Sequence, residues 1–93
     1  KKISAMHFEW NEEKNILLKE VRNISFEDIV LAIQGDKILD FIESPTHENQ
    51  SCLVVDFNGY AYIVPFVQKN ESTIFLKTIY PSRKHTKFYN LKD

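Results

Sequence analysis

CLVVDFNGYAYIVPFV, residues 52–67, is the stretch of sequence that decides the fold of this 93-residue chain. Two runs rich in β-branched and aromatic residues, 52–57 and 60–67, flank Asn58-Gly59. Asn-Gly between two such runs is the strongest short-range signal for a type I′ β-hairpin, because both central residues of that turn need a positive φ. Pro65 lacks the N–H that a ladder uses, so it predicts a sheet edge or a bulge near the end of the second run. The centre of the chain is therefore expected to be an antiparallel hairpin.

Two more strands are expected, one on either side of this hairpin along the chain. Residues 38–42 have the period-two pattern of a strand, and a polar loop over residues 44–50 follows them. After a second turn, residues 73–80 are expected to form a strand that places Lys77 on the same face as Ile79. Strands that follow one another in this way form an antiparallel meander.

The first third of the chain predicts a short strand and then a helix. Residues 7–10 hold two aromatic side chains in a short extended run, and Asn11 is a suitable N-cap for a helix. The helix is expected to run to about Arg22, since Asn23 readily takes the left-handed conformation that ends a helix.

Helix-start signals also occur at two later serines. Ser25 and Asp28 form a variant of the capping box, and Gly35 is expected to end the helix that they start. Ser82 is suited to cap a final helix over about residues 83–91. The resulting order of one strand, two helices, four strands and one helix belongs to the α+β class.

Length and composition favour a single small domain over residues 6–93. Residues 1–5 carry no recognisable pattern and are expected to be an added remnant or a disordered leader before Met6. The single cysteine, Cys52, has no partner for a disulfide within the chain. No apolar run approaches the roughly 18 residues that a membrane helix needs. A cytoplasmic protein that does not contact membranes is therefore expected.

The sequence holds no pattern typical of a metal or cofactor site. The three histidines, His7, His47 and His85, lack the spacing of zinc ligands, and there is no second cysteine. The two glycines, Gly35 and Gly59, both have turn roles, so neither is left for a loop that holds a phosphate. No metal and no cofactor are expected.

Charge is spread unevenly along the chain. The last seventeen residues, 77–93, carry five bases and one acid, a net charge of +4, whereas the preceding 76 residues carry seven bases and twelve acids, a net charge of −5. The near-neutral total therefore hides a basic terminus on an acidic body. A basic segment of this kind is typical of a protein that binds an anionic partner, most simply nucleic acid.

Three residues of the basic terminus are candidates for RNA cleavage. Transfer of a phosphate to the ribose 2′-OH needs a base, an acid and a cation that stabilises the charged phosphorane. His85 can serve as acid or base near neutral pH. Arg83 and Lys77 can supply the positive charge, Arg83 from an exposed corner where its guanidinium can bind a phosphate through two bonds. A solvated strand lysine is an equally good interpretation of Lys77.

Other residues are candidates for RNA binding. Lys84 lies in the same corner of the chain, while Lys87 and Lys92 are interpreted as solvated helix residues. Trp10 and Tyr89 are of the residue types that stack on unpaired bases, although a core position is the alternative for Trp10.

Three segments together resemble the BrnT family of toxins. FEWNEEKN (residues 8–15) and ISFED (residues 24–28) match the aromatic first strand and the helix pair of that family. IYPSRK (residues 79–84) matches its arginine-bearing corner. The resemblance covers essentially residues 6–89.

The resemblance implies both a fold and a function. It implies a RelE-like fold and the toxin of a bacterial type II toxin–antitoxin system, which cleaves RNA and is held inactive by a small antitoxin with a ribbon-helix-helix part. Operator DNA would be bound only through that antitoxin. By position, Trp10, Lys14 and Arg83 correspond to family motif residues. Arg22 replaces the usual histidine of the family and keeps a positive charge for phosphate binding.

Two other functions stay open at this point. The chain can be a catalytically inactive binding module that acts through a complex with an antitoxin or a regulator. It can also be a toxin with a target other than RNA, such as gyrase, as in some relatives of the RelE-like fold.

Overall fold

The central hairpin forms as the sequence predicts. The computed structural model describes residues 3–43 and 51–91, and in it Asn58 and Gly59 have φ values of 55° and 79°. These two residues join β3 (Ser51–Phe57) to β4 (Tyr60–Asn70). The strands pair without interruption along the whole length of β3, so the turn fixes their register.

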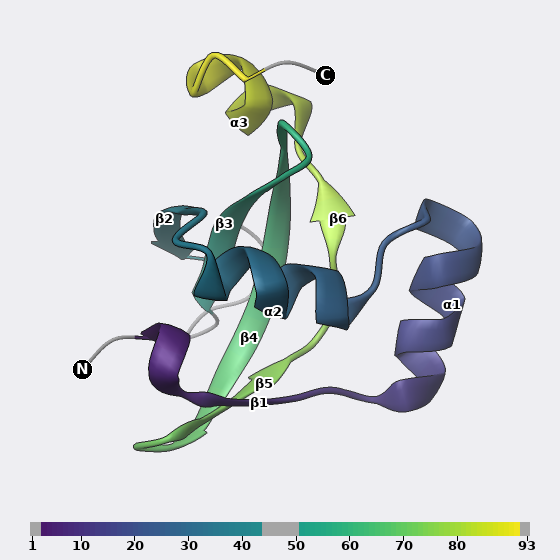
Figure 1. Ribbon diagram of the computed structural model, residues 1–93, viewed down its shortest axis with the longest axis vertical. Coiled ribbons are helices and arrows are strands. Elements are labelled where there is room, and N and C mark those ends of the chain that lie inside the picture. The colour runs from purple at the N-terminus through teal and green to yellow at the C-terminus, as the bar shows by residue number, and fades with distance from the viewer. Residues whose placement is uncertain (1–2, 44–50, 92–93) are drawn as a thin grey trace.

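The sheet is mixed rather than wholly antiparallel. Its other strands are β1 (His7–Glu9), β2 (Ile38–Glu43), β5 (Thr73–Leu76) and β6 (Tyr80–Pro81). Their order is β1-β5-β4-β3-β2, with β6 beside β4 (Figure 1). Strands β2 to β5 are successive antiparallel neighbours, which confirms the predicted meander, and β1 adds to β5 in parallel. The loop predicted over residues 44–50, with His47, lies outside the described residues, as does Lys92.

The strand predicted over residues 73–80 is broken in the structure. β5 ends at Leu76, the N–H of Lys77 donates to the carbonyl of Pro65 (2.9 Å), and pairing with β4 resumes at β6. Leu76 and Ile79 are both buried in one core cluster, so the strict alternation of faces fails between them. The prediction that Ile79 shares a face with Lys77 is therefore wrong, because Ile79 is buried and Lys77 is exposed.

Pro65 lies beside a bulge, as predicted, but not at a sheet edge: between the pairs Ile63–Tyr80 and Phe66–Leu76, two residues of β4 face three residues of the neighbouring segment. Pro65 is buried in the middle of β4, opposite Cys52 of β3, and β4 has neighbours on both of its sides. The N–H and C=O of one antiparallel strand residue point to the same side. The carbonyl of Pro65 faces Lys77, so its missing N–H faces the gap between β5 and β6. A proline is tolerated inside this strand because the ladder is interrupted there.

The helix boundaries follow the local capping signals. Three α-helices occur in the described residues: α1 (Glu12–Arg22), α2 (Phe26–Gln34) and α3 (Arg83–Phe88). The N-caps Asn11, Ser25 and Ser82 each accept a backbone N–H, and Ser25 forms the predicted capping box with Asp28. α3 is shorter than its predicted span, since Tyr89 is its C-cap.

The C-terminal ends of α1 and α2 use left-handed residues. Asn23 ends α1 with a φ of 56°, as predicted. Gly35 caps α2, but its φ is −87°, and the left-handed residue is the next one, Asp36, with a φ of 66°. The chain can thus turn into β2 without a glycine in the left-handed position.

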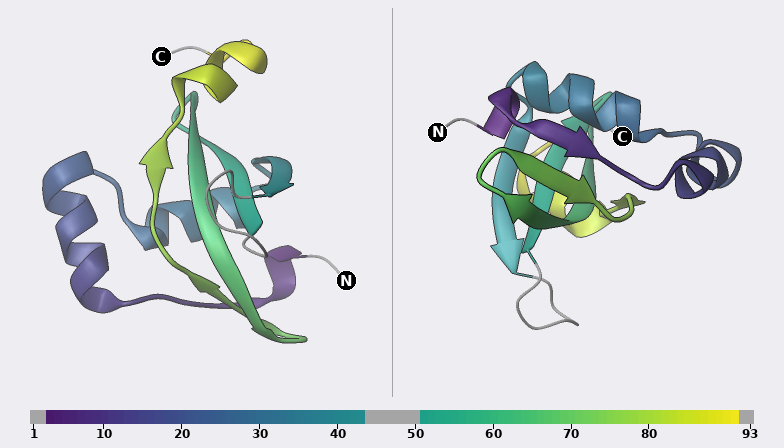
Figure 2. Two further views of the ribbon diagram at one scale, coloured as in Figure 1. Left: turned by 180° about the vertical axis from the view of Figure 1, so that it is seen from behind. Right: turned by 90° about the horizontal axis from the view of Figure 1, so that it is seen from below.

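Each face of the sheet has its own apolar cluster. α2 crosses one face, where Phe26, Ile29 and Ile33 are buried against strand residues such as Leu53 and Val64 (Figures 1 and 2). The other face holds a second cluster, formed by the buried residues Cys52, Val54, Ala61 and Ile63. Tyr80 of β6 packs against this cluster, as do Tyr89 and Leu91, which follow α3. Burial of each such apolar side chain contributes about 1.5–3 kcal/mol. The residues that flank α3 therefore attach this helix to the second apolar cluster.

A short helical turn precedes the first strand. It is a 3-10 helix at Ile3–Ala5, and Ile3 and Met6 pack against the first apolar cluster.

A buried asparagine sets the angle between α1 and α2. The side chain of Asn15 is fully buried, accepts the N–H of Phe26 at 2.7 Å and donates to Glu27 Oε1 at 2.8 Å. The ring of Trp10 stacks on Phe26, with centroids 5.6 Å apart. Asn15 therefore satisfies a first-turn N–H of α2, a group that no bond within the helix can satisfy.

Candidate nucleic-acid interface

α3 is fixed to the sheet through its one buried residue. Thr86 is 3% exposed, and its Oγ1 accepts the N–H of Ala61 (2.9 Å) while donating to the carbonyl of Ser82 (2.8 Å). The N–H of Ser82 donates in turn to the carbonyl of Ala61 (2.9 Å). These bonds hold α3 across the beginning of β4, so the side chains on the outer side of α3 have a defined position.

The basic terminus presents several cations without acidic partners. Lys77, Arg83, Lys84 and Lys87 are exposed, and none forms an ion pair or a side-chain hydrogen bond with another residue of the ranges 3–43 and 51–91. Lys69, by contrast, binds Glu9 at 2.9 Å. The free cations remain available to an anionic ligand.

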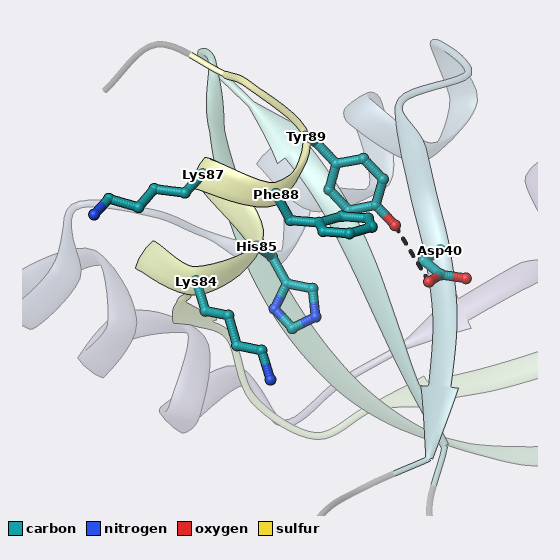
Figure 3. A pocket seen from close by; sticks show the side chains of 6 residues that line it. All are labelled: Asp40, Lys84, His85, Lys87, Phe88 and Tyr89. Carbon is teal, nitrogen blue, oxygen red and sulfur yellow. Dashed lines mark hydrogen bonds between the residues drawn. The ribbon is translucent and has the colours of Figure 1, made fainter.

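A pocket of about 490 Å³ lies between α3 and β2 (Figure 3). Such a volume is within the range of small-molecule sites, roughly 300–1,000 Å³. The pocket combines positive charge, two aromatic rings, an imidazole and a carboxylate. Its lining residues are Asp40, Lys84, His85, Lys87, Phe88 and Tyr89.

Tyr89 joins the two walls of the pocket. Its hydroxyl donates to Asp40 Oδ2 at 3.2 Å and lies 3.4 Å from the carbonyl oxygen of Leu39. Burial of the phenol raises the pKa of Tyr89, and the hydrogen bond to Asp40 and the charge of that carboxylate raise it further. The phenol therefore stays protonated and continues to donate to Asp40 in the neutral pH range.

His85 is held by the cap of its own helix. Ser82 Oγ accepts the backbone N–H of His85 (3.2 Å) and lies 2.7 Å from Nδ1 of the ring. When Nδ1–H donates to the serine oxygen, Nε2 is the unprotonated nitrogen of the neutral ring, and it can take a proton from a ligand and return it. The ring is on the side of α3 that faces Asp40, next to Lys84 (Figure 3).

The structure brings together only some of the site residues predicted from the sequence. Lys84, His85 and Tyr89 line one pocket, and Arg83 is the first residue of the same helix. Lys77 is exposed in the gap between β5 and β6 and does not line the pocket.

Three other predicted RNA-binding residues belong to the first helix and its approach. Trp10 is half-buried, stacks on Phe26 and donates to Glu12 Oε1 at 3.3 Å. Arg22 donates to the carbonyl of Ile79 at 2.7 Å, which ties the end of α1 to the gap before β6. Lys14 lies in the first turn of α1. Trp10 and Arg22 thus have structural contacts in addition to any contact with RNA.

Sequence reasoning missed three residues of the pocket: Lys87, interpreted as a solvated helix residue, and also Phe88 and Asp40. Phe88 is 76% exposed and lies three and four residues after His85 and Lys84, so helical spacing alone places the three on one side of α3. Asp40 gave no such signal, because it comes from a strand that is distant in the sequence. The partner of Asp40 in the pocket, Tyr89, was predicted only as a stacking residue.

Three general searches add no further assignment for the described residues: one for membrane-spanning helices, one for metal sites and one for similar proteins. No α-helix in the described ranges is long and apolar enough to cross a membrane. Over the same residues, there is no group of three or more His, Cys, Asp or Glu side chains that could hold a metal ion. Comparison of the chain with family models, with curated proteins and with solved structures gives no match.

Proposed function

We propose that the protein is the toxin of a type II toxin–antitoxin system and acts in the cytoplasm as a metal-independent endoribonuclease with a RelE-like fold. The observation that carries the proposal is the pocket at α3, where unpaired cations, an imidazole and an exposed aromatic ring lie side by side. Positive charge binds the phosphate backbone and aromatic rings stack on unpaired bases. The resemblance to the BrnT family supports the same reaction.

The proposed reaction is transfer of the scissile phosphate to the ribose 2′-OH. A base removes the 2′-OH proton, O2′ attacks phosphorus, the P–O5′ bond breaks and an acid protonates the leaving O5′. His85, through Nε2, takes one of these proton-transfer roles. Arg83 stabilises the charge of the phosphorane, with Lys84 beside it as a phosphate-binding residue. Lys77 stays a prediction as a further cation for this charge.

The proposed partner is an antitoxin, expected to be of the ribbon-helix-helix type, through which operator DNA would also be bound. An acidic body suits an inhibitor that carries basic segments, because the first 76 residues have a net charge of −5. Co-purification with the product of an adjacent short gene, and loss of RNA cleavage in that complex, are the expected results.

RNA cleavage by the purified chain tests the proposal. We expect a single-stranded RNA of mixed sequence, incubated with excess chelator, to give products with 2′,3′-cyclic phosphate ends. Arg83→Ala and His85→Ala should each lower the rate by about 10²–10³-fold, the usual cost of losing a charge-stabilising group or an acid–base residue.

Lys69→Ala is the matched control for these variants. Lys69 is also an exposed cation, but it lies near the far end of β4 from α3 (Figure 1). Its loss removes one surface ion pair, worth about 0–1 kcal/mol, and should leave cleavage unchanged. RNA that stays intact with a folded protein would reject the ribonuclease; RNA binding without cleavage would then favour the inactive binding module.

A further inference from the structure

We infer that the pocket between α3 and β2 holds one unpaired guanine base of the RNA, and that Asp40 recognises this base. The inference rests on the proposed function, since it names the base that the ribonuclease would select. It depends on three features of the pocket: an exposed aromatic ring, an oriented carboxylate and a neighbouring cation.

Phe88 provides the stacking surface. Its side chain is 76% exposed, although it lies in a pocket wall, and its ring meets that of Tyr89 edge to face at 4.9 Å and 87°. Tyr89 is held in turn by Asp40, so the ring of Phe88 is supported on one side by a fixed neighbour while most of the residue remains exposed. Stacking of a base on an aromatic ring is a common way to bind single-stranded RNA and does not select among bases.

Asp40 provides the selection. Its Oδ1 accepts the N–H of Phe41 at 2.8 Å, and its Oδ2 accepts the hydroxyl of Tyr89 at 3.2 Å. An ionised carboxylate has about four acceptor positions, so each oxygen of Asp40 keeps one free acceptor position for a ligand. The two bonds also hold the carboxylate in a fixed orientation. Guanine offers N1–H and an N2 amino group side by side, which two carboxylate oxygens can accept together.

The other bases do not match this acceptor pair. Adenine and cytosine each place a ring acceptor next to their one amino group, and uracil places carbonyl oxygens on both sides of its N–H. An acceptor against a carboxylate is repulsive, so Asp40 rejects these bases as well as attracting guanine. By the usual discrimination of a bidentate contact to a base edge, guanine should be preferred by about 10-fold to 100-fold.

Lys84 is placed to bind the phosphate attached to this base. It lines the same pocket and lies beside His85, whereas Lys87 extends away from Asp40 (Figure 3). A base bound between Phe88 and Asp40 would therefore have its phosphate near Lys84 and the imidazole of His85. The arrangement places the recognised nucleotide next to His85, the one residue proposed for cleavage that lines the pocket.

Binding of mononucleotides to the full chain tests the inference. We expect guanosine monophosphate to bind at least 10-fold more tightly than the adenosine, cytidine and uridine monophosphates, with NMR shift changes at Asp40, Phe88 and Tyr89. Inosine monophosphate, which lacks the N2 amino group, should bind several-fold more weakly than guanosine monophosphate. Equal affinity for the four nucleotides, no binding of guanosine monophosphate at millimolar concentration, or shift changes confined to other residues would each overturn the inference.

Two variants separate recognition by Asp40 from its structural role. Asp40→Asn keeps an acceptor for Tyr89 but presents a donor to guanine, and it should reduce the preference for guanine to within about 3-fold. Tyr89→Phe removes one of the two bonds that orient the carboxylate and leaves the bond from the Phe41 N–H, so the preference should fall less than in Asp40→Asn. Loss of the preference in Tyr89→Phe but not in Asp40→Asn would reject recognition by Asp40.

The mononucleotide experiment is independent of cleavage, because a mononucleotide has no scissile internucleotide bond. Guanine-selective binding by a protein that leaves RNA intact would retain the inference and reject the ribonuclease. RNA cleavage without a guanine preference, together with unselective nucleotide binding, would retain the proposed ribonuclease and reject guanine recognition by the pocket.

Discussion

Asn15 is the residue on which the arrangement of α1 and α2 depends most. It is fully buried and satisfies both the N–H of Phe26 and a carboxylate oxygen of Glu27. Asn15→Ala should lower the free energy of unfolding by about 2–3 kcal/mol, because the N–H of Phe26 is left buried without an acceptor. Urea denaturation measures this loss. Ile16→Ala, at a neighbour that is 49% exposed, is the control and should change stability by under about 1 kcal/mol.

The same residue predicts a pH dependence. The hydrogen bond from Asn15 is the main cause that holds the pKa of Glu27 below its ordinary value. A lowered carboxyl pKa stabilises the fold above the unfolded pKa, and this contribution is lost as the pH falls through the folded pKa. The difference in unfolding free energy between the wild type and Asn15→Ala should therefore shrink between about pH 7 and about pH 3. A difference that is the same at both pH values would contradict the link.

At the scale of elements, α3 depends on a single threonine. Thr86→Val keeps the shape of the side chain but removes the acceptor of the buried N–H of Ala61. The expected loss of stability is about 1–3 kcal/mol, measured by chemical denaturation, and RNA binding should weaken because α3 carries the pocket. Thr78→Val is a matched control, since the Thr78 hydroxyl forms no hydrogen bond with any residue of the ranges 3–43 and 51–91. An equal loss in both variants would show that the anchor at Ala61 is not the cause.

The elements also show which parts of the structure the sequence can predict. The caps Asn11, Ser25 and Ser82 and the Asn58-Gly59 turn are encoded within a few residues, and their predictions are confirmed. Pro65 predicted a bulge in its own strand, but the break that faces it lies between β5 and β6, where the period-two alternation of residues 73–80 gave no sign of it.

The candidate site also contains residues that the sequence predicts and residues that it does not. Lys84, His85 and Tyr89 were predicted because they lie in one short basic segment. Asp40 entered the pocket only through pairing of β2 with β3 and the contact with Tyr89, which no local pattern encodes. The aromatic ring that is free to stack is Phe88, since Tyr89 is engaged with Asp40.

At the scale of the whole molecule, the uneven charge predicts a salt dependence. If RNA crosses α3, then Arg83, Lys84 and Lys87 neutralise up to three phosphates, and the logarithm of the binding constant should fall with the logarithm of salt concentration with a slope of about −2. Lys84→Ala should reduce the magnitude of this slope by about 0.7, and Lys69→Ala should leave it unchanged. Fluorescence anisotropy with a labelled RNA measures the slope. An affinity that does not respond to salt would remove α3 from the binding surface.

The parallel pairing of β1 with β5 affects when the sheet can be completed during synthesis of the chain. His7 pairs with Thr73, so β1 finds its neighbour only after the 65 residues between them have been synthesised. Contacts between such distant residues form late in folding, since a long loop must close first. α3, with its pocket, emerges later still. A growing chain therefore lacks the pocket between α3 and β2 until residues 83–89 have been synthesised, well after β2 itself.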